Sequence, residues 1–310
     1  MPETPSSPVL RCASGTQYRL QRGRATAVVT ELAAALREYT VDGVLLTETF
    51  GDHQIPPGAS GITLAPWANR VEGGKWTLNG GVQQLDITEV SRNNASHGLL
   101  RNASYSCLEQ SGTRVVLEAT VFPQHGYPFL VRHRVAYELE ETGALCVTQT
   151  LLNDADAAAP VVLGAHPYLR LGELPAGDLT VTVRADSWLE TDERLIPRAQ
   201  RPVSGGTDLR AGVVLAELDT DTAYTGLERD EAGVARTVLS GSDGRSVTLW
   251  QDRACGYVHI YATGGFDGRA KALAVEPMTG PANAFNSGDG LHWVQPGEEF
   301  SMSWGIEASW

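Results

Sequence analysis

Short strand-like runs separated by turn residues extend through most of the chain and constrain its fold more than any other feature. Apolar and polar residues alternate, or nearly alternate, in seven such runs: 113–122, 129–139, 144–153, 178–186, 245–252, 256–263 and 271–277. This period is typical of strands with one face in a core. Gly, Pro, Asn and Asp stand between the runs, and 33 glycines are available for the turns. The pattern predicts an all-β fold, either an antiparallel sandwich or a barrel.

One segment conflicts with this pattern. Residues 30–40, TELAAALREYT, have high helix propensity, and Leu32, Leu36 and Tyr39 recur at roughly helical spacing. Local features therefore leave helix and strand equally open there. We find no internal repeat and no linker long enough to separate two domains. We expect a flexible N-terminal tail over residues 1–9 and a single domain over residues 10–310.

Charge and cysteine usage limit the partners and the compartment. The 310 residues include 37 acidic and 24 basic ones, a net charge of −13, which would repel nucleic acid or an acidic membrane. No apolar stretch approaches the roughly 18–20 residues of a membrane helix, and the N-terminus lacks a signal-peptide pattern. Four cysteines lie far apart, which favours a reducing, cytoplasmic compartment. No nucleotide or metal motif is present, so we expect neither a cofactor nor a metal.

Five segments combine chemically capable side chains with turn residues or strand ends. They contain Asn69 and Arg70, His97, His166, Asp219 and Asp221, and Glu276. Each also has a structural explanation: a surface ion pair, a solvated loop histidine, a hydrogen-bonded core histidine, a turn cap or a buried ion pair. Together they offer an acid, a base and groups that hydrogen-bond the hydroxyls of a sugar.

Glu276 is the most unusual of these residues. The apolar run 272–275 predicts a buried strand, with Glu276 at its end. Burying an ionised carboxylate costs several kcal/mol unless it is paired or keeps its proton. This position therefore requires either a structural partner or a chemical role.

Five motifs, in chain order, resemble those of the aldose 1-epimerases, or galactose mutarotases. They are PWANRVEGGKW, HGLL, AHPYLRL, LDTDTAYTGL and AVEPMTGPANAFNSGDGL followed by QPGEEF. The resemblance runs from about residue 20 to the C-terminus. It implies one large antiparallel β-sandwich, the galactose mutarotase-like supersandwich, with an open cleft for a free aldose. It also implies strands over residues 26–48 in place of the local helix signal.

The resemblance also implies roles for the two catalytic candidates. Glu276 would be the general base that removes the proton of the anomeric hydroxyl, and His166 the general acid that protonates the ring oxygen. The loop after Glu276 would form part of the cleft wall.

Four further residues match sugar-contacting positions of the family. Arg70, His97 and Asp221 are the stronger matches, and Asn69 is a weaker one beside Arg70. We choose Asp221 over Asp219 because the family pattern places an aromatic residue three positions later, where Tyr224 stands.

Three other functions remain open. A hexose-6-phosphate 1-epimerase on the same fold would need extra Arg or Lys side chains to hold a phosphate. A glycoside hydrolase would use Asp221 and Glu276 as paired carboxylates, which leaves His97 and His166 without roles. A non-catalytic carbohydrate-binding protein would not need the Glu276–His166 pair. We expect a small aldose as ligand and a monomer or weak homodimer.

Overall fold

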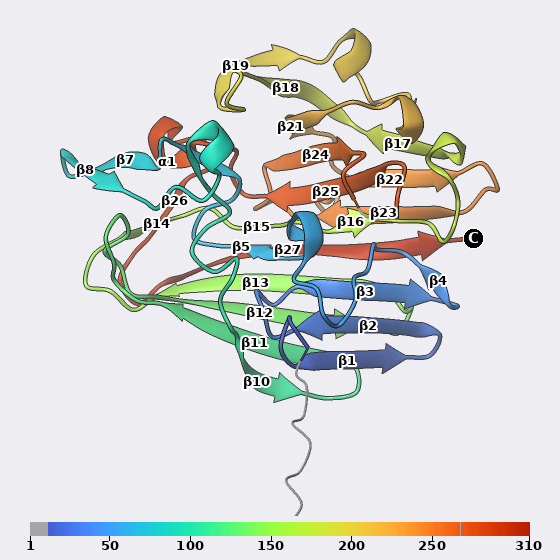
Figure 1. Ribbon diagram of the computed structural model, residues 1–310, viewed down its shortest axis with the longest axis horizontal. Helices are drawn as coiled ribbons and strands as arrows, with labels where there is room; N and C mark the ends of the chain where they lie inside the picture. Colours follow the sequence, from blue (N-terminus) through green and yellow to red (C-terminus); the bar gives the residue numbers. More distant parts are fainter. Residues whose placement is uncertain (1–11, 267) are drawn as a thin grey trace, which may run out of the picture.

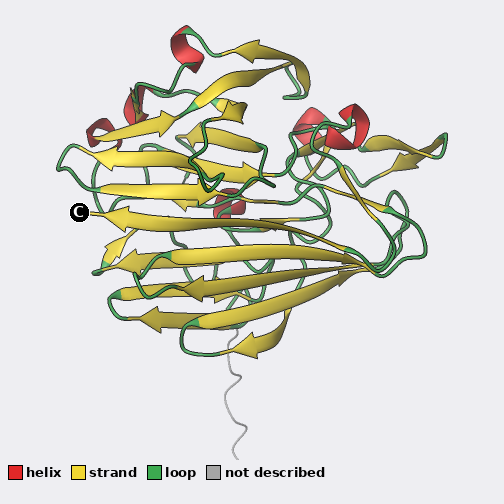
Figure 2. Cartoon of the chain, turned by 180° about the vertical axis from the view of Figure 1, so that it is seen from behind, coloured by secondary structure: helices red, strands yellow, loops and turns green. Residues whose placement is uncertain are grey.

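A computed structural model describes residues 12–266 and 268–310, so the tail predicted for residues 1–9 lies outside the described part. Two large antiparallel sheets, of nine and eight strands, make up most of the molecule (Figure 1). Figure 2 shows the long strands of the nine-stranded sheet side by side. The predicted all-β sandwich is confirmed.

The strands of the nine-stranded sheet follow in spatial order. They are β10 (Ser106–Gln110), β11 (Arg114–Val121), β12 (Val131–Leu139), β13 (Leu145–Asn153), β27 (Glu299–Ser309), β23 (Ser246–Gln251), β22 (Ala235–Gly241), β17 (Leu179–Val183) and β20 (Val213–Val214).

The eight-stranded sheet carries the cleft described below. Its strands are β19 (Pro197–Pro202), β18 (Ala185–Thr191), β21 (Asp221–Leu227), β24 (Tyr257–Thr263), β25 (Ala272–Met278), β15 (Gly164–Ala165) and β5 (Thr63–Leu64), with β16 (Tyr168–Leu169) also paired to β25.

Smaller sheets and short helices complete the fold. A four-stranded sheet contains β1 (Gln17–Arg22), β2 (Ala25–Thr30), β3 (Leu36–Val41) and β4 (Val44–Leu45). Three strand pairs are β6 (Arg70–Glu72) with β9 (Asn94–Ser96), β7 (Lys75–Leu78) with β8 (Gly81–Gln84), and β14 (Ala159–Val161) with β26 (His292–Val294). The helices are α1 (Ala284–Ser287) and 3-10 turns at Pro57–Ala59, Val90–Arg92, Ala176–Asp178, Gly205–Thr207 and Leu215–Glu217. Within residues 12–266 and 268–310, no helix has the length and apolar character needed to cross a membrane.

The predicted strands correspond closely to the observed ones. Only the run 178–186 divides, into β17 and the start of β18. The segment 30–40 is not helical: β2 and β3 flank a tight turn in which Ala33 and Ala34 adopt φ values of 57° and 45°. Both alanines are fully buried. Tertiary packing therefore overrides helix propensity here, and the strands implied by the family resemblance are confirmed.

Strand alternation explains how the core and the cleft share one sheet. On β24 and β25, Val258, Ile260, Leu273 and Val275 belong to the main hydrophobic core. Because successive side chains point to opposite faces, Glu276 must face away from Val275 and out of that core. All of β25 is nevertheless buried, which shows that its second face is covered as well.

The strand also extends beyond the predicted end. Glu276 lies inside β25, which continues to Met278. The loop that follows supports a neighbouring strand and is not among the residues that line the cleft. Asn283 accepts a hydrogen bond from the Glu72 backbone N–H at 3.1 Å and donates its own backbone N–H to the Arg70 carbonyl at 2.5 Å. The loop therefore holds β6 in place, and the expectation that it forms the cleft wall is wrong.

Candidate active site

One open cleft of about 590 Å³ contains every residue that the sequence predicted for the site. These residues are Asn69, Arg70, His97, His166, Asp221 and Glu276. They come from β6 and the residue before it, from β21 and β25, and from the loops after β9 and β15, so the fold gathers segments more than 200 residues apart in sequence. Asp219 is exposed and does not line the cleft, which agrees with the choice of Asp221.

Glu276 and His166 form a buried pair. The Oε1 atom of Glu276 lies 3.3 Å from the Nε2 atom of His166, and the two side chains are only 2% and 6% exposed. Glu276 Oε2 and His166 Nδ1 have no hydrogen-bond partner among the described residues. A carboxylate oxygen left without a partner at a buried position costs free energy, so it calls for a ligand or a functional explanation.

The backbone and two rings fix the position of His166. Its N–H donates to the Ile62 carbonyl at 3.0 Å, and its carbonyl accepts from the Gly61 N–H at 2.8 Å. The imidazole stacks on Tyr168 at a centroid distance of 5.3 Å and meets the ring of His97 edge to face, also at 5.3 Å. These contacts orient Nε2 toward Glu276.

His97 lies in a turn that few side chains tolerate. Its φ is 63°, and the backbone N–H donates to the Asn69 carbonyl at 2.8 Å. The next residue, Gly98, also has a positive φ, and a Cβ there would lie 2.0 Å from the Ala65 carbonyl oxygen. Only glycine fits at that position, and backbone strain of this kind often accompanies functional sites.

Arg70 is held by a carboxylate that the sequence did not single out. Its Nε and Nη2 atoms donate to Glu89 at 2.9 and 3.1 Å, and its Nη1 donates to Asn69 Oδ1 at 3.0 Å. Arg70 Nη2 also lies 3.8 Å from Asp221 Oδ2. Burial acts against the charge of Glu89, but the bond from Arg70 outweighs it and lowers the pKa of Glu89.

His259 is the second residue that the sequence interpretation missed. It lies on β24 directly opposite Glu276 in the strand register, and its Nε2 is 2.7 Å from Asp221 Oδ1. The Asn69 amide nitrogen lies 3.5 Å from its Nδ1. A histidine in the run YVHIYAT was a usable signal, because its apolar neighbours Val258 and Ile260 point the other way. Nothing local indicated that this second face lines a cleft.

Burial and charge set the protonation of the cleft groups. Burial lowers the pKa of His166 although the charge of Glu276 opposes it, and burial lowers the pKa of His97 further, reinforced by His166. Burial also disfavours a charged His259, but Glu276 and the bond to Asp221 prevail and raise the pKa of His259. For Asp221 the penalty of burial is outweighed by His259 and Arg70, which lower its pKa to about 2.

Within the described residues no group of three His, Cys, Asp or Glu side chains is arranged to hold a metal ion. The groups that converge on the cleft are carboxylates, imidazoles and guanidinium groups. The arrangement can move protons and hydrogen-bond a small polyhydroxylated molecule. It defines a β-sandwich protein with a buried carboxylate–imidazole pair in an open polar cleft.

Comparison with known proteins gives the class a name. The chain belongs to the aldose 1-epimerase family, whose profile matches residues 16–306. It is 30% identical over 296 residues to the uncharacterized protein YihR of Escherichia coli K12, covering 94% of this chain and 93% of that protein.

Solved structures share the fold at low sequence identity. A galactose mutarotase-like protein from Clostridium acetobutylicum superposes with a TM-score of 0.83 at 17% identity, covering 94% of both chains. A putative aldose 1-epimerase from Escherichia coli K12 gives 0.82 at 19% identity, over 95% of this chain and 99% of the other. Galactose 1-epimerase from Lactobacillus acidophilus gives 0.78 at 20% identity, over 94% and 93%. These similarities establish the galactose mutarotase-like fold.

Proposed function

We propose that the protein is a cofactor-independent, cytoplasmic aldose 1-epimerase that interconverts the α and β anomers of an aldose. The observation that carries the proposal is the buried contact of 3.3 Å between Glu276 and His166 inside a polar cleft. Membership of the aldose 1-epimerase family supports it. A protein that only bound sugar would have no use for such an acid–base pair.

The reaction needs one proton removed and one supplied. Glu276, as carboxylate, takes the proton of the C1 hydroxyl, while His166, as imidazolium, gives its proton to the ring oxygen as the C1–O5 bond breaks. The open-chain aldehyde rotates about C1–C2, and ring closure on the other face returns both protons. Each group acts in both directions, so the pair ends in its starting state and no covalent intermediate forms.

The local electrostatics suit these roles. Because burial lowers the pKa of His166, its imidazolium gives up a proton more readily than an ordinary histidine does. The charge of Glu276 opposes this shift and keeps the proton within the pair. Glu276 Oε2, which has no partner among the described residues, is the atom available to the C1 hydroxyl.

The remaining cleft residues would hold the sugar. Arg70 and Asp221 are already fixed by Glu89 and His259, so they can hydrogen-bond hydroxyls with little loss of side-chain entropy. We assign His97 a place beside the ring oxygen, because its ring contacts His166.

Polarimetry of freshly dissolved α-D-glucose and α-D-galactose tests this function. The wild-type protein should speed the approach to anomeric equilibrium, and Glu276→Gln and His166→Asn should each lose about 10²–10⁴-fold of the catalysed rate. Circular dichroism would verify that the variants are folded. A folded Glu276→Gln protein with full activity would show that Glu276 is not the base.

A further inference from the structure

Arg101 differs from the other arginines that line the cleft. Arg70 and Arg92 both bind Glu89, at 2.9 and 3.1 Å. Within residues 12–266 and 268–310, Arg101 has no carboxylate within 4.0 Å, and its one hydrogen bond is a long one, 3.4 Å, to the Ser96 carbonyl. A guanidinium group has five N–H donors, so most of those of Arg101 are unused.

This arginine is also half-buried, which makes its missing partner costly. Burial lowers the pKa of Arg101, and the charge of Glu89 offsets this only in part. Charged groups taken out of water normally have a counter-ion. An arginine that lines a cleft without one is a binding group for an anion, which it can hold by paired N–H bonds.

The position of Arg101 indicates which part of a sugar it would meet. Arg101 follows His97 by four residues in the loop after β9, both residues line the cleft, and the ring of His97 lies 5.3 Å from that of His166. In the proposed reaction His166 serves the ring oxygen. In a pyranose the ring oxygen is bonded to C5, which carries the exocyclic carbon C6. Because Glu276 meets the C1 hydroxyl on one side of the ring oxygen in that reaction, the C6 group on the other side is the substituent left for Arg101.

The charge of the cleft differs from that of the whole chain. Overall, 37 acidic residues outnumber 24 basic ones. The cleft has three arginines, Arg70, Arg92 and Arg101, against three carboxylates, Glu89, Asp221 and Glu276. Each carboxylate already has a basic partner within 4 Å. The cleft can thus admit a negative charge that the rest of the surface would repel.

We propose that the natural substrate is an aldose with an anionic group on its exocyclic carbon, and that Arg101 binds this group. The inference rests on the proposed epimerase function and names the substrate class of the same cleft. The anionic group would be a phosphate ester, a sulfate ester or a carboxylate, since each of these presents negatively charged oxygens to the guanidinium group. Glu276 and His166 act on C1 and the ring oxygen as they would in a neutral sugar.

The test compares kcat/KM for anomer exchange, measured by NMR, on glucose, glucose 6-phosphate, glucose 6-sulfate and glucuronate. Buffer rates are subtracted for each sugar. The wild-type protein should prefer at least one anionic sugar over glucose by about tenfold or more, since a hydrogen bond to a charged group contributes about 1.5–3 kcal/mol. The three anions show which group fits.

Variants of two arginines then test the residue. Arg101→Met should lower the ratio of kcat/KM for the preferred anionic sugar to that for glucose by about 10- to 100-fold. Arg101→Lys, which keeps the charge, should retain part of the preference. Arg184→Met removes the same charge from an exposed arginine outside the cleft and should leave the ratio unchanged.

The outcomes separate the two proposals. Equal rates on neutral and anionic sugars, or a ratio that Arg101→Met leaves intact, overturn the anionic substrate while the epimerase function stands. No acceleration of any sugar by the wild-type protein overturns the epimerase function and this inference with it. If Arg101→Met fails to fold, the ratio in wild type and Arg101→Lys, and its decline with added salt, still decide the question.

Discussion

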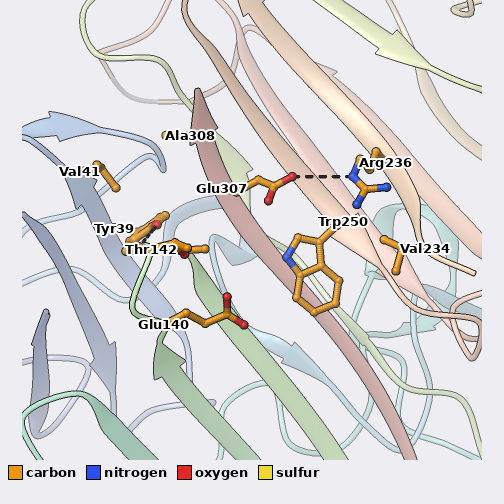
Figure 3. Close-up of a pocket in the computed structure, with 11 residues that line it drawn as sticks. Tyr39, Val41, Glu140, Thr142, Val234, Arg236, Trp250, Glu307 and Ala308 are labelled. Carbon is orange, nitrogen blue, oxygen red and sulfur yellow. Dashed lines mark hydrogen bonds and ion pairs between the residues drawn. The ribbon is translucent and has the colours of Figure 1, made fainter. Parts of the chain in front are cut away.

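The cleft and a second hollow both place glutamate beside a basic side chain, but the pair is buried in the cleft and exposed in the hollow. The second hollow, of about 390 Å³, is lined in part by β3, β22, β23 and β27 and contains two carboxylates, an arginine and a tryptophan (Figure 3). Its Arg236 lies 3.7 Å from Glu307, and the two side chains are 44% and 46% exposed. In the cleft, Glu276 is only 2% exposed. Both places set a carboxylate beside a basic side chain, but histidines line the cleft and none is among the residues that line the second hollow.

The charged side chains of the two places also differ in burial. Water solvates Glu307 and Arg236 and screens their interaction, so such surface pairs contribute little. Glu276 has one oxygen beside His166 and one without a partner among the described residues. Charges in such a water-excluded place interact more strongly with the groups around them than solvated charges do. We therefore expect chemistry in the cleft and none in the hollow of Figure 3.

The largest expected effect is on the catalysed rate of mutarotation. Glu276→Gln should reduce kcat by about 10²–10⁴-fold, because it removes the group that we propose as the base. The same exchange at Glu307 should change kcat by less than about twofold, because that carboxylate is solvated and lies outside the cleft. Polarimetry on both purified variants measures this. Equal losses in the two variants would contradict the distinction drawn between the regions.

A second pair of variants compares a glycine in each region. Gly98→Ala should lower the free energy of unfolding by about 3 kcal/mol, since the new Cβ would lie 2.0 Å from the Ala65 carbonyl oxygen at a positive φ. At Gly143 beside the second hollow, the new Cβ would meet only the Ala25 side chain, at 3.3 Å. Gly143→Ala should cost about 1 kcal/mol, the strain of the positive φ alone. Urea unfolding distinguishes them, and a smaller loss for Gly98→Ala would refute the clash.

Loss of activity at Glu276 should not mean loss of stability. Glu276→Gln removes a buried charge, and His166, whose pKa burial lowers, can remain neutral beside the amide. We expect the free energy of unfolding to rise by about 1 kcal/mol, because the buried, incompletely paired charge of Glu276 is removed. Urea titration measures it, with Glu307→Gln expected within about 0.5 kcal/mol of wild type. A clear loss of stability in Glu276→Gln would show that the pair is structural.

The smallest expected effect is a change in the pKa of His259. Asp221 helps to raise the pKa of His259 above its ordinary value of 6.5, so Asp221→Asn should lower that pKa. Because the folded-state pKa is the higher one, protonated His259 stabilises the fold below pH 6.5, and this contribution is lost as the pH rises through the folded-state pKa. NMR titration of the imidazole measures the shift. Asp219→Asn, at an exposed site outside the cleft, should leave the titration unchanged.

Sequence patterns predicted most of the strands, because a period of two is a local property. They placed Glu276 at the end of its strand, whereas β25 continues two residues further, to Met278. They were undecided at residues 30–40, where the left-handed Ala33 and Ala34 depend on packing against distant strands. The family resemblance supplied what local propensity lacked there.

Some features of the candidate site could likewise be predicted from the sequence, and others could not. The sequence by itself determined the alternation that forms the sheets, and its resemblance to a family singled out six residues that converge on the cleft. Only the tertiary structure decided that His259 faces Glu276, that Glu89 holds Arg70, and that Arg101 has no carboxylate partner among the described residues. These facts depend on strand register and on contacts between residues far apart in the chain, such as Asn69 and His259, and no local pattern encodes them.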